Sequence, residues 1–184
     1  VLSGGMILPD YPQPISTMAG FIEKEYKTVE SYAGVRFGED YLWHIKNPDL
    51  SDWYPRSEKP AVALCVFKEY LPDSQVAFAA DLQFGLQFEG RDLCDDEAYR
   101  QLIHKYKLPE EEFYERLHSP EYREKAYYEF ALVKQLQVTG FPSTLLQADS
   151  TKFYLLSRGY TDYDTLKQHI DSVLKELESR PSAG

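Results

Sequence analysis

Apolar side chains recur at intervals of three and four residues in several stretches, the spacing of one face of an amphipathic helix. The pattern is clear from Ile15 to Ala33, after which Gly34 is expected to end the helix. Other predicted helices lie at Pro60 to Pro72, Asp73 to Phe88, Asp96 to Tyr106, after Pro109, and Pro120 to Leu136. The helix containing Val76 to Phe88 is expected to be buried on most sides, because Asp81 is its only charged residue.

Two segments depart from this helical period. From Val35 to Arg56 no period is sustained, and we expect an ordered loop rich in aromatic residues. After Val138 the pattern becomes extended, with strands predicted at Ser143 to Gln147 and Lys152 to Leu156 and turn-forming residues between them. Gly159 then interrupts the chain before a final amphipathic helix that carries Tyr163, Leu166, Ile170, Val173 and Leu177.

Composition and charge narrow the possible functions. The chain has 184 residues, with 20 Lys+Arg against 30 Asp+Glu and a formal net charge of −10, so no nucleic-acid partner is expected. A hydrophobic content of 43% with 15% aromatic residues is enough to build a core. No stretch approaches the roughly 18 to 20 uninterrupted apolar residues of a spanning helix, and the first residues lack the features of a signal peptide. The sequence predicts a soluble, acidic protein with no membrane partner.

The candidate reactive residues form no familiar motif. Cys65 and Cys94 are far apart and make neither a CxxC pair nor a zinc spacing, so a structural role is expected for both. Cys94 stands just ahead of a predicted helix, whose N-terminus can lower the pKa of a thiol, which leaves a reactive role open. No two of the four histidines have metal-ligand spacing on one helix, and neither a metal nor a cofactor is expected. His44 is expected to be an exposed polar residue, with a catalytic role beside Trp43 as the alternative.

Four segments, taken in order, resemble the DsbA family of thioredoxin-fold proteins. They are Leu2 to Met6, the helix opened by Pro60 and Ala61, Leu86 to Leu93, and the stretch VTGFPST at 138–144 that precedes strand, turn, strand and helix. The similarity covers nearly the whole chain and is greatest to the cytoplasmic, bacterial FrnE-like branch. It implies an α/β thioredoxin-like fold, truncated at the N-terminus, with a large all-helical insertion. The expected organisation is a strand and loop at 1–13, the insertion at 14–137, strand, hairpin and helix at 138–178, and a tail at 179–184.

The resemblance implies thiol-disulfide oxidoreductase or isomerase activity in the cytoplasm, without a cofactor. Family members begin with a strand and a CxxC-bearing helix ahead of the segment that corresponds to Val1 to Met6, and neither is present here. The chain as given is therefore expected to lack dithiol activity and a catalytic residue. We expect that the natural chain begins several tens of residues earlier. The alternative is that another segment or subunit takes the place of the missing strand in the sheet.

The resemblance also suggests where a substrate would bind. A cis bond between Phe141 and Pro142 is expected at the start of the strand, where the backbone of Phe141 would pair with an extended peptide or protein thiol substrate. The alternative is a trans proline that only ends a turn. Family members more often carry a small or β-branched residue at the position of Phe141. Trp43, Trp53 and Tyr54 either line the same cleft or belong to the core of the insertion.

Two other functions remain open. The first is a noncatalytic peptide-binding or adaptor module that keeps the groove and lacks the thiols. The second, weaker alternative is an isomerase or glutathione-transferase relative in which a residue other than cysteine performs the chemistry. The sequence leaves the oligomeric state open.

Overall fold

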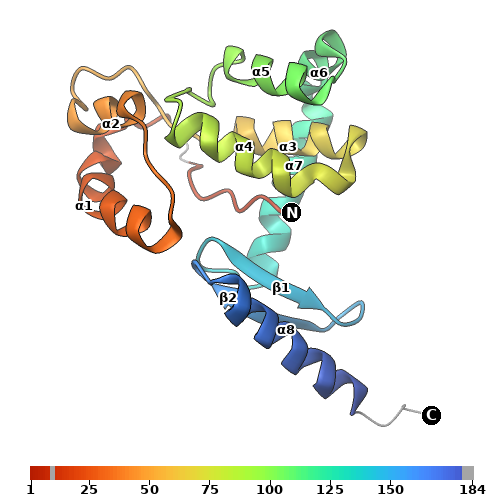
Figure 1. The fold of residues 1–184 in the computed structure, drawn as a ribbon. Coiled ribbons are helices and arrows are strands. Elements are labelled where there is room, and N and C mark those ends of the chain that lie inside the picture. The colour runs from red at the N-terminus through yellow and green to blue at the C-terminus, as the bar shows by residue number, and fades with distance from the viewer. Residues whose placement is uncertain (9–10, 180–184) are drawn as a thin grey trace. The chain divides into compact units, whose positions relative to one another are not determined.

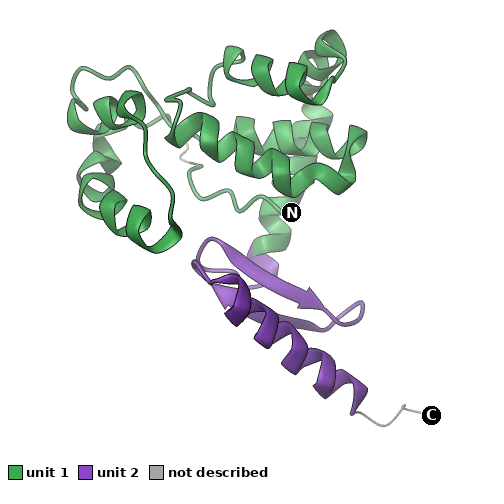
Figure 2. Cartoon of the chain, viewed as in Figure 1, with its two compact units in different colours: residues 1–133 green, residues 134–184 purple. Residues whose placement is uncertain are grey.

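The computed structural model describes residues 1–8 and 11–179 of the chain (Figure 1). The helices are α1 (Ser16–Ala33), α2 (Glu39–Lys46), α3 (Glu58–Tyr70), the short 3-10 helix η1 (Pro72–Ser74), α4 (Gln75–Gln87), α5 (Glu97–Tyr106), α6 (Glu110–Leu117), α7 (Pro120–Gln135) and α8 (Tyr163–Glu178). The strands β1 (Ser143–Gln147) and β2 (Phe153–Arg158) follow α7. The chain divides into two compact units, unit 1 from Val1 to Val133 and unit 2 from Lys134 to Gly184 (Figure 2).

The main core of unit 1 is built around α3. Every residue from Ala61 to Phe67 is buried, so this helix is apolar on all sides rather than on one stripe. Phe67 stacks on Phe78 of α4, with the two ring centroids 4.0 Å apart. Tyr99 of α5 and Phe113 of α6 are fully buried in the same cluster. α7 also contributes to this cluster, so the five helices from α3 to α7 share one apolar interior.

A second cluster of buried side chains joins the start of α1 to α2 and to the segment after α2. Its members are Ile15, Ala19, Tyr41, Leu42, Ile45 and Trp53. The N–H of Ile15 donates a hydrogen bond of 2.9 Å to the carbonyl of Trp53, which ties the two ends of this region together. Gly34 has a φ of 66° and ends α1, as the sequence predicted.

The prediction of a loop from Val35 to Arg56 is wrong in part, because α2 lies within it. Tyr41, Leu42 and Ile45 of α2 are buried and do follow helical spacing. The helix has only eight residues, however, and about two turns give too short a run of apolar positions to establish a period. The rest of the segment, including Trp53 and Tyr54, has no regular secondary structure, as expected.

The prediction that α4 is buried on most sides is also wrong. Only Phe78, Leu82 and Gly85 of this helix are buried. Phe84 and Phe88 are about half exposed and stack on each other, with their ring centroids 4.8 Å apart. Pairing of the two rings covers part of their apolar surface without a further helix above them.

The strand predicted at the start of the chain is not formed by residues 1–8. The N–H of Ser3 donates to the Glu129 carboxylate on α7, and the N–H of Ile7 donates to Ser57 Oγ, each over 2.9 Å. Ser57 in turn donates its N–H to the Ile7 carbonyl. These backbone groups therefore find partners in unit 1 without a neighbouring strand. Residues 9–10 of the predicted 1–13 segment, and 180–184 of the predicted tail, lie outside the described residues.

Unit 2 consists of an antiparallel hairpin and one helix. In the pairing of β1 with β2, Ser143 lies opposite Arg158 and Gln147 opposite Phe153, with an irregularity between Thr144 and Leu145. α8 contacts β2 and is capped at its N-terminus by Asp162. Leu156 is the single buried side chain in the described part of unit 2, so most of its apolar residues remain partly exposed.

None of the helices in the described ranges is both long enough and apolar enough to cross a bilayer.

Gly38 joins the start of α2 to the end of α4, and we predict that alanine at this position destabilises unit 1. Its N–H donates to the Gln87 carbonyl over 2.9 Å, and a Cβ here would lie 1.7 Å from the Phe88 carbonyl oxygen. Gly38→Ala should lower the free energy of unfolding in urea by roughly 1 to 3 kcal/mol, the usual cost of overpacking.

Gly20→Ala on α1 is the matched control. No atom lies within 4 Å of its added Cβ, and alanine favours the helix, so stability should stay equal or rise by up to about 1 kcal/mol. Equal unfolding free energies for the two variants would contradict the close approach at Gly38.

Candidate functional site

The turn that leads into β1 is held by hydrogen bonds from both strands of the hairpin. The peptide bond between Phe141 and Pro142 is cis. The Pro142 carbonyl accepts a hydrogen bond of 2.7 Å from the N–H of Gly159, which follows β2 and has a φ of 80°. Ser143 Oγ donates to the Gly140 carbonyl, also over 2.7 Å. The carbonyls on either side of Phe141 are therefore occupied within the hairpin.

Phe141 itself has free backbone groups. Within residues 1–8 and 11–179, its N–H and its carbonyl make no hydrogen bond, and its side chain is 43% exposed. β1 also pairs with β2 alone in the described structure, so its other edge is open. Unpaired strand edges of this kind accept an extended chain as an additional strand. Phe141 and β1 together therefore form a candidate peptide-binding edge.

Arg158 lies at the same end of the hairpin, and sequence reasoning did not identify it. It is exposed and stands opposite Ser143 in the strand pairing. A Cβ on Gly140 would lie 3.5 Å from Arg158 Cγ and 3.7 Å from its Cδ, so the arginine stem runs across this glycine. The sequence shows only an arginine followed by a glycine after a predicted strand. The residues that lie beside this arginine depend on the strand register, which the sequence does not show.

The three aromatic residues predicted to line the site all belong to unit 1, and they differ in burial. Trp53 is 6% exposed and belongs to the second core cluster, which agrees with the core alternative for this residue. Trp43 and Tyr54 are 46% and 48% exposed. Phe141 and Pro142 belong to unit 2, so a cleft shared by all five residues stays a prediction.

His44 is not the exposed polar residue that was predicted. Its ring is partly buried and stacks on Trp53, with the centroids 3.9 Å apart. Its Nδ1 lies 2.7 Å from Ser51 Oγ, and Ser51 Oγ also accepts the N–H of Trp53 over 3.2 Å. Burial lowers the pKa of His44, although the carboxylates of Asp52, Asp92 and Asp40 act in the opposite direction. The sequence could not show this because the apolar partner follows α2 in an irregular segment.

The reactive-thiol alternative for Cys94 is not supported by its surroundings. Burial raises the pKa of this thiol and the Asp92 carboxylate adds to the rise, which outweighs a backbone hydrogen bond from Arg56. Cys65 is buried within α3, and both cysteines are free. A thiol with a raised pKa is a poor nucleophile at neutral pH.

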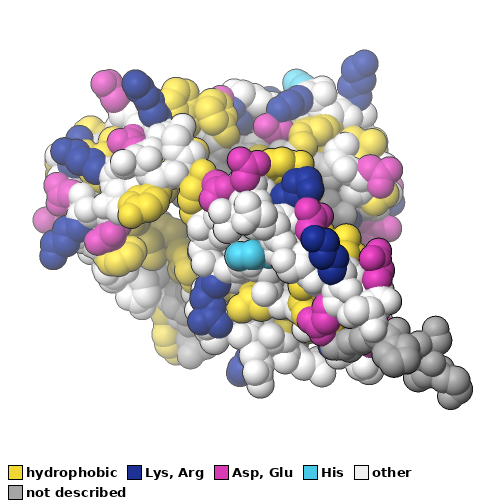
Figure 3. All heavy atoms as spheres, turned by 60° about the horizontal axis from the view of Figure 1, so that its bottom comes forward, with side chains coloured by type: hydrophobic (Ala, Val, Ile, Leu, Met, Phe, Trp, Pro, Cys, Tyr) yellow, Lys and Arg dark blue, Asp and Glu magenta, His cyan; other side chains and the backbone are white. Residues whose placement is uncertain are grey.

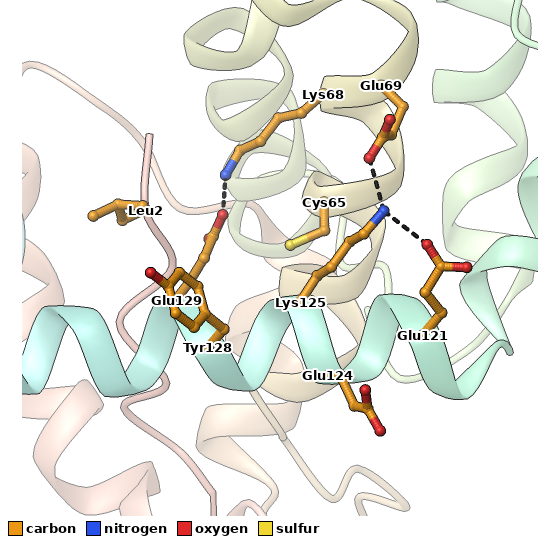
Figure 4. A pocket seen from close by; sticks show the side chains of 9 residues that line it. All are labelled: Leu2, Cys65, Lys68, Glu69, Glu121, Glu124, Lys125, Tyr128 and Glu129. Atoms are coloured by element: carbon orange, nitrogen blue, oxygen red, sulfur yellow. Dashed lines mark hydrogen bonds and ion pairs between the residues drawn. The ribbon is translucent and has the colours of Figure 1, made fainter.

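Cys65 faces a pocket of about 510 Å³ between α3 and α7 in unit 1 (Figure 4). The thiol lies between two sets of ion pairs in this view. Lys68 pairs with Glu129, while Lys125 Nζ lies 2.8 Å from Glu69 and 3.0 Å from Glu121. Burial is the main cause that raises the pKa of Cys65 to about 11. Because the lysines are already paired, the pocket offers neither a thiolate nor a free cation.

The other titratable side chains in the described residues are not gathered into a metal site. No three His, Cys, Asp or Glu side chains in the described part of the chain come together in a way that could hold a metal ion. On the face shown in Figure 3, basic and acidic side chains are interspersed. Phe141, whose exposed N–H and carbonyl have no partner among the described residues, therefore remains the candidate site.

Comparison with known proteins bears on the fold of the chain. No family model matches the chain, and no curated protein matches it in sequence. A candidate protein disulfide isomerase from Nitrosomonas europaea has a similar crystal structure, with a TM-score of 0.77 and 20% identity over 91% of this chain and 78% of that one. The cytosolic disulfide reductase DsbM from Pseudomonas aeruginosa is also similar, with a TM-score of 0.72 and 20% identity over 94% of this chain and 82% of that one. The structure of the same reductase with glutathione has a TM-score of 0.69 and 21% identity, again over 94% of this chain and 82% of that one.

The chain has a thioredoxin-like fold of the DsbA type. This confirms the predicted α/β thioredoxin-like fold class. The structure is mostly helical, with one two-stranded sheet among the described residues. In this thioredoxin-like chain the hairpin and α8 form unit 2, and α1 to α6 with most of α7 form unit 1. The helical unit 1 thus makes up the larger part of the chain, and the insertion at 14–137 stays a prediction.

We predict that His44 makes the stability of unit 1 depend on pH. Because burial lowers the pKa of the folded imidazole below the unfolded value of about 6.5, the unfolded state binds more protons below that pH. The stabilisation is thus fully present above pH 6.5 and is lost as the pH falls. Between pH 7.5 and 5, the native chain should lose more unfolding free energy in urea than His44→Gln does.

The control for this measurement is His104→Gln, which removes an exposed imidazole from α5. Parallel pH profiles for the native chain and His44→Gln would show that the stacked imidazole contributes nothing to the acid sensitivity.

Proposed function

We propose that the chain is a DsbA-like module for thiol-disulfide exchange, and that unit 2 binds an extended segment of a thiol-bearing substrate along β1. The proposal joins two supports. The first is the fold, whose solved neighbours include a disulfide reductase and a candidate disulfide isomerase. The second, which carries the proposal, is that Phe141 is exposed just ahead of β1 and that its N–H and carbonyl have no hydrogen-bond partner among residues 1–8 and 11–179.

Addition of a substrate strand would give partners to the N–H and carbonyl of Phe141, in a turn whose neighbouring carbonyls are already hydrogen-bonded. An extended peptide beside β1 would receive and donate backbone hydrogen bonds at alternate residues. Pro142 has no N–H and its carbonyl is bound by Gly159, so Phe141 supplies the hydrogen bonds at this corner. The exposed ring of Phe141 adds apolar contact with the same peptide. In this role Phe141 and Pro142 are substrate-binding residues, joined by Trp43 and Tyr54 if the two units form one cleft.

The thiol chemistry itself is not supplied by the cysteines of these 184 residues. Dithiol exchange needs two cysteines within disulfide reach, with one of them reactive as a thiolate. Cys65 and Cys94 are both free, and the pKa of each is raised. This favours, for the chain as given, the noncatalytic binding role as the second candidate function. Both roles use the same β1 edge.

The partners follow from the site. A protein thiol in extended conformation fits the open edge, and glutathione is a second thiol to consider, since DsbM has been solved with it. A net charge of −10 disfavours nucleic acid. We place the protein in the bacterial cytoplasm, on the sequence resemblance and on its likeness to a cytosolic reductase.

Peptides with selective backbone methylation test the proposed pairing. We would use blocked seven-residue peptides with serine in place of the substrate cysteine, methylated at one or the other alternate set of amide nitrogens. Only one set faces β1, so one isomer should bind at least about tenfold more weakly than the unmodified peptide, because each lost hydrogen bond costs about 0.5 to 1.5 kcal/mol. Isothermal titration calorimetry measures the affinities.

The other isomer is the matched control, because it has the same composition and added bulk. It should bind like the unmodified peptide. Equal affinity of both isomers would mean that backbone pairing at a strand edge does not hold the peptide, and this would overturn the proposal.

We further predict that the chain as given does not reduce insulin disulfides. Turnover with a thiol reductant should equal the buffer control, because neither cysteine has a second thiol available for exchange. Cys94→Ser should leave this background unchanged, and DsbM serves as the positive control. Insulin reduction clearly above buffer that disappears in Cys94→Ser would assign the chemistry to Cys94 and refute the account.

A further inference from the structure

Arg158 is an uncompensated positive charge in an acidic protein. Most arginines have a carboxylate within 4.0 Å, namely Arg56, Arg91, Arg100, Arg116 and Arg123. Arg36 and Arg158 have none among residues 1–8 and 11–179, and Arg158 is the one that lies in the hairpin unit. With 30 Asp+Glu against 20 Lys+Arg in the chain, a free guanidinium is the exception. Its charge is available to another molecule.

The position of Arg158 links this charge to the peptide-binding edge. The arginine stem crosses Gly140, which has no side chain to block it, at 3.5 Å from the place of a Cβ. The next residue, Gly159, donates its N–H to Pro142. Gly140 and Phe141 are consecutive residues, so the stem of Arg158 lies beside the turn in which the N–H and carbonyl of Phe141 have no partner among the described residues. A peptide that pairs with Phe141 would therefore lie close to this side chain.

We propose that Arg158 binds a carboxylate of the substrate that lies along the turn from Gly140 to Pro142. The inference rests on the proposed function, because it assigns substrate chemistry to the same site. A guanidinium presents several N–H donors in a plane and matches a carboxylate through two parallel hydrogen bonds. The carboxylate belongs to an Asp or Glu near the substrate thiol, or to a small acidic thiol such as glutathione.

Because the protein is acidic, a preference for acidic peptides would identify a local contact. At −10 the protein as a whole repels an acidic peptide, so tighter binding of such a peptide must come from a local contact.

Three peptides that differ at one position test the contact. Each is a blocked seven-residue peptide with serine in place of the substrate cysteine, and the residue beside the serine is Glu, Gln or Lys. The native chain should bind the Glu peptide about threefold to tenfold more tightly than the Gln peptide at low salt, the range of an exposed to partly shielded charged hydrogen bond. The preference should shrink as salt is raised, because the pair is exposed.

Variants of the hairpin assign the preference to one side chain. Arg158→Gln should abolish it, Arg158→Lys should keep part of it, and Arg158→Glu should favour the Lys peptide. Lys152→Gln is the matched control, since it removes a positive charge from the opposite end of the same hairpin, where Lys152 lies over the Tyr154 ring. This variant should keep the preference. Circular dichroism verifies that each variant is folded.

A second arm distinguishes the source of the carboxylate. Glutathione and its diethyl ester are compared on the native chain and on Arg158→Gln. Weaker binding of the ester, lost in Arg158→Gln, supports a small acidic thiol as the source. If the native chain prefers the Glu peptide but binds glutathione and its diethyl ester equally, the carboxylate belongs to an acidic residue of a protein substrate.

The outcomes separate this inference from the proposed function. If all three peptides bind the native chain equally, or if a preference survives Arg158→Gln, the role of Arg158 is refuted while peptide binding at β1 stands. If none of the peptides and neither glutathione probe binds, the proposed function fails and the inference fails with it.

Discussion

Backbone hydrogen bonding is satisfied on one side of β1 and left open on the other, and the functional account depends on this asymmetry. β2 provides the inner partners, and the bond from Gly159 to Pro142 fixes the turn ahead of the strand. Phe141 is exposed, so its N–H and carbonyl are accessible to another molecule. We propose that an extended substrate pairs with them, and Arg158 adds a charge at the same corner.

Unit 1 contributes a rigid interior rather than reactive groups. The residues that first suggest chemistry there are occupied by packing or pairing. His44 is stacked on Trp53, and Cys65 has a pKa of about 11 beside ion pairs that neutralise both lysines of its pocket. Cys94 is likewise held with a raised pKa. The likeness to disulfide reductases is thus a likeness of fold, and the thiols of this chain do not reproduce their chemistry.

Sequence reasoning succeeded where a local signal sets a boundary. Gly34 ends α1 and Pro120 opens α7, so these boundaries could be predicted closely. It failed where the apolar pattern is too short, or where the pattern does not show how much of a helix is covered. Two turns were too short to reveal α2, and stacking of Phe84 on Phe88 allows α4 to remain partly exposed.

In the candidate site, too, some residues could be predicted from the sequence and others could not. Phe141 and Pro142 stand in a recognisable local stretch before a strand, so a resemblance was enough to select them. Arg158 depends on the register that places it opposite Ser143 and on the missing Cβ of Gly140. Neither is visible in a linear sequence. The burial of Trp53 likewise depends on contacts with α1 and α2.

The most direct test of peptide addition at β1 is the solution structure of the complex between this chain and a blocked extended peptide. The account predicts nuclear Overhauser effects between the peptide backbone and Phe141 through Gln147, together with slowed amide exchange along that segment. Intermolecular contacts confined to the helices of unit 1, or to the outer edge of β2, would contradict it.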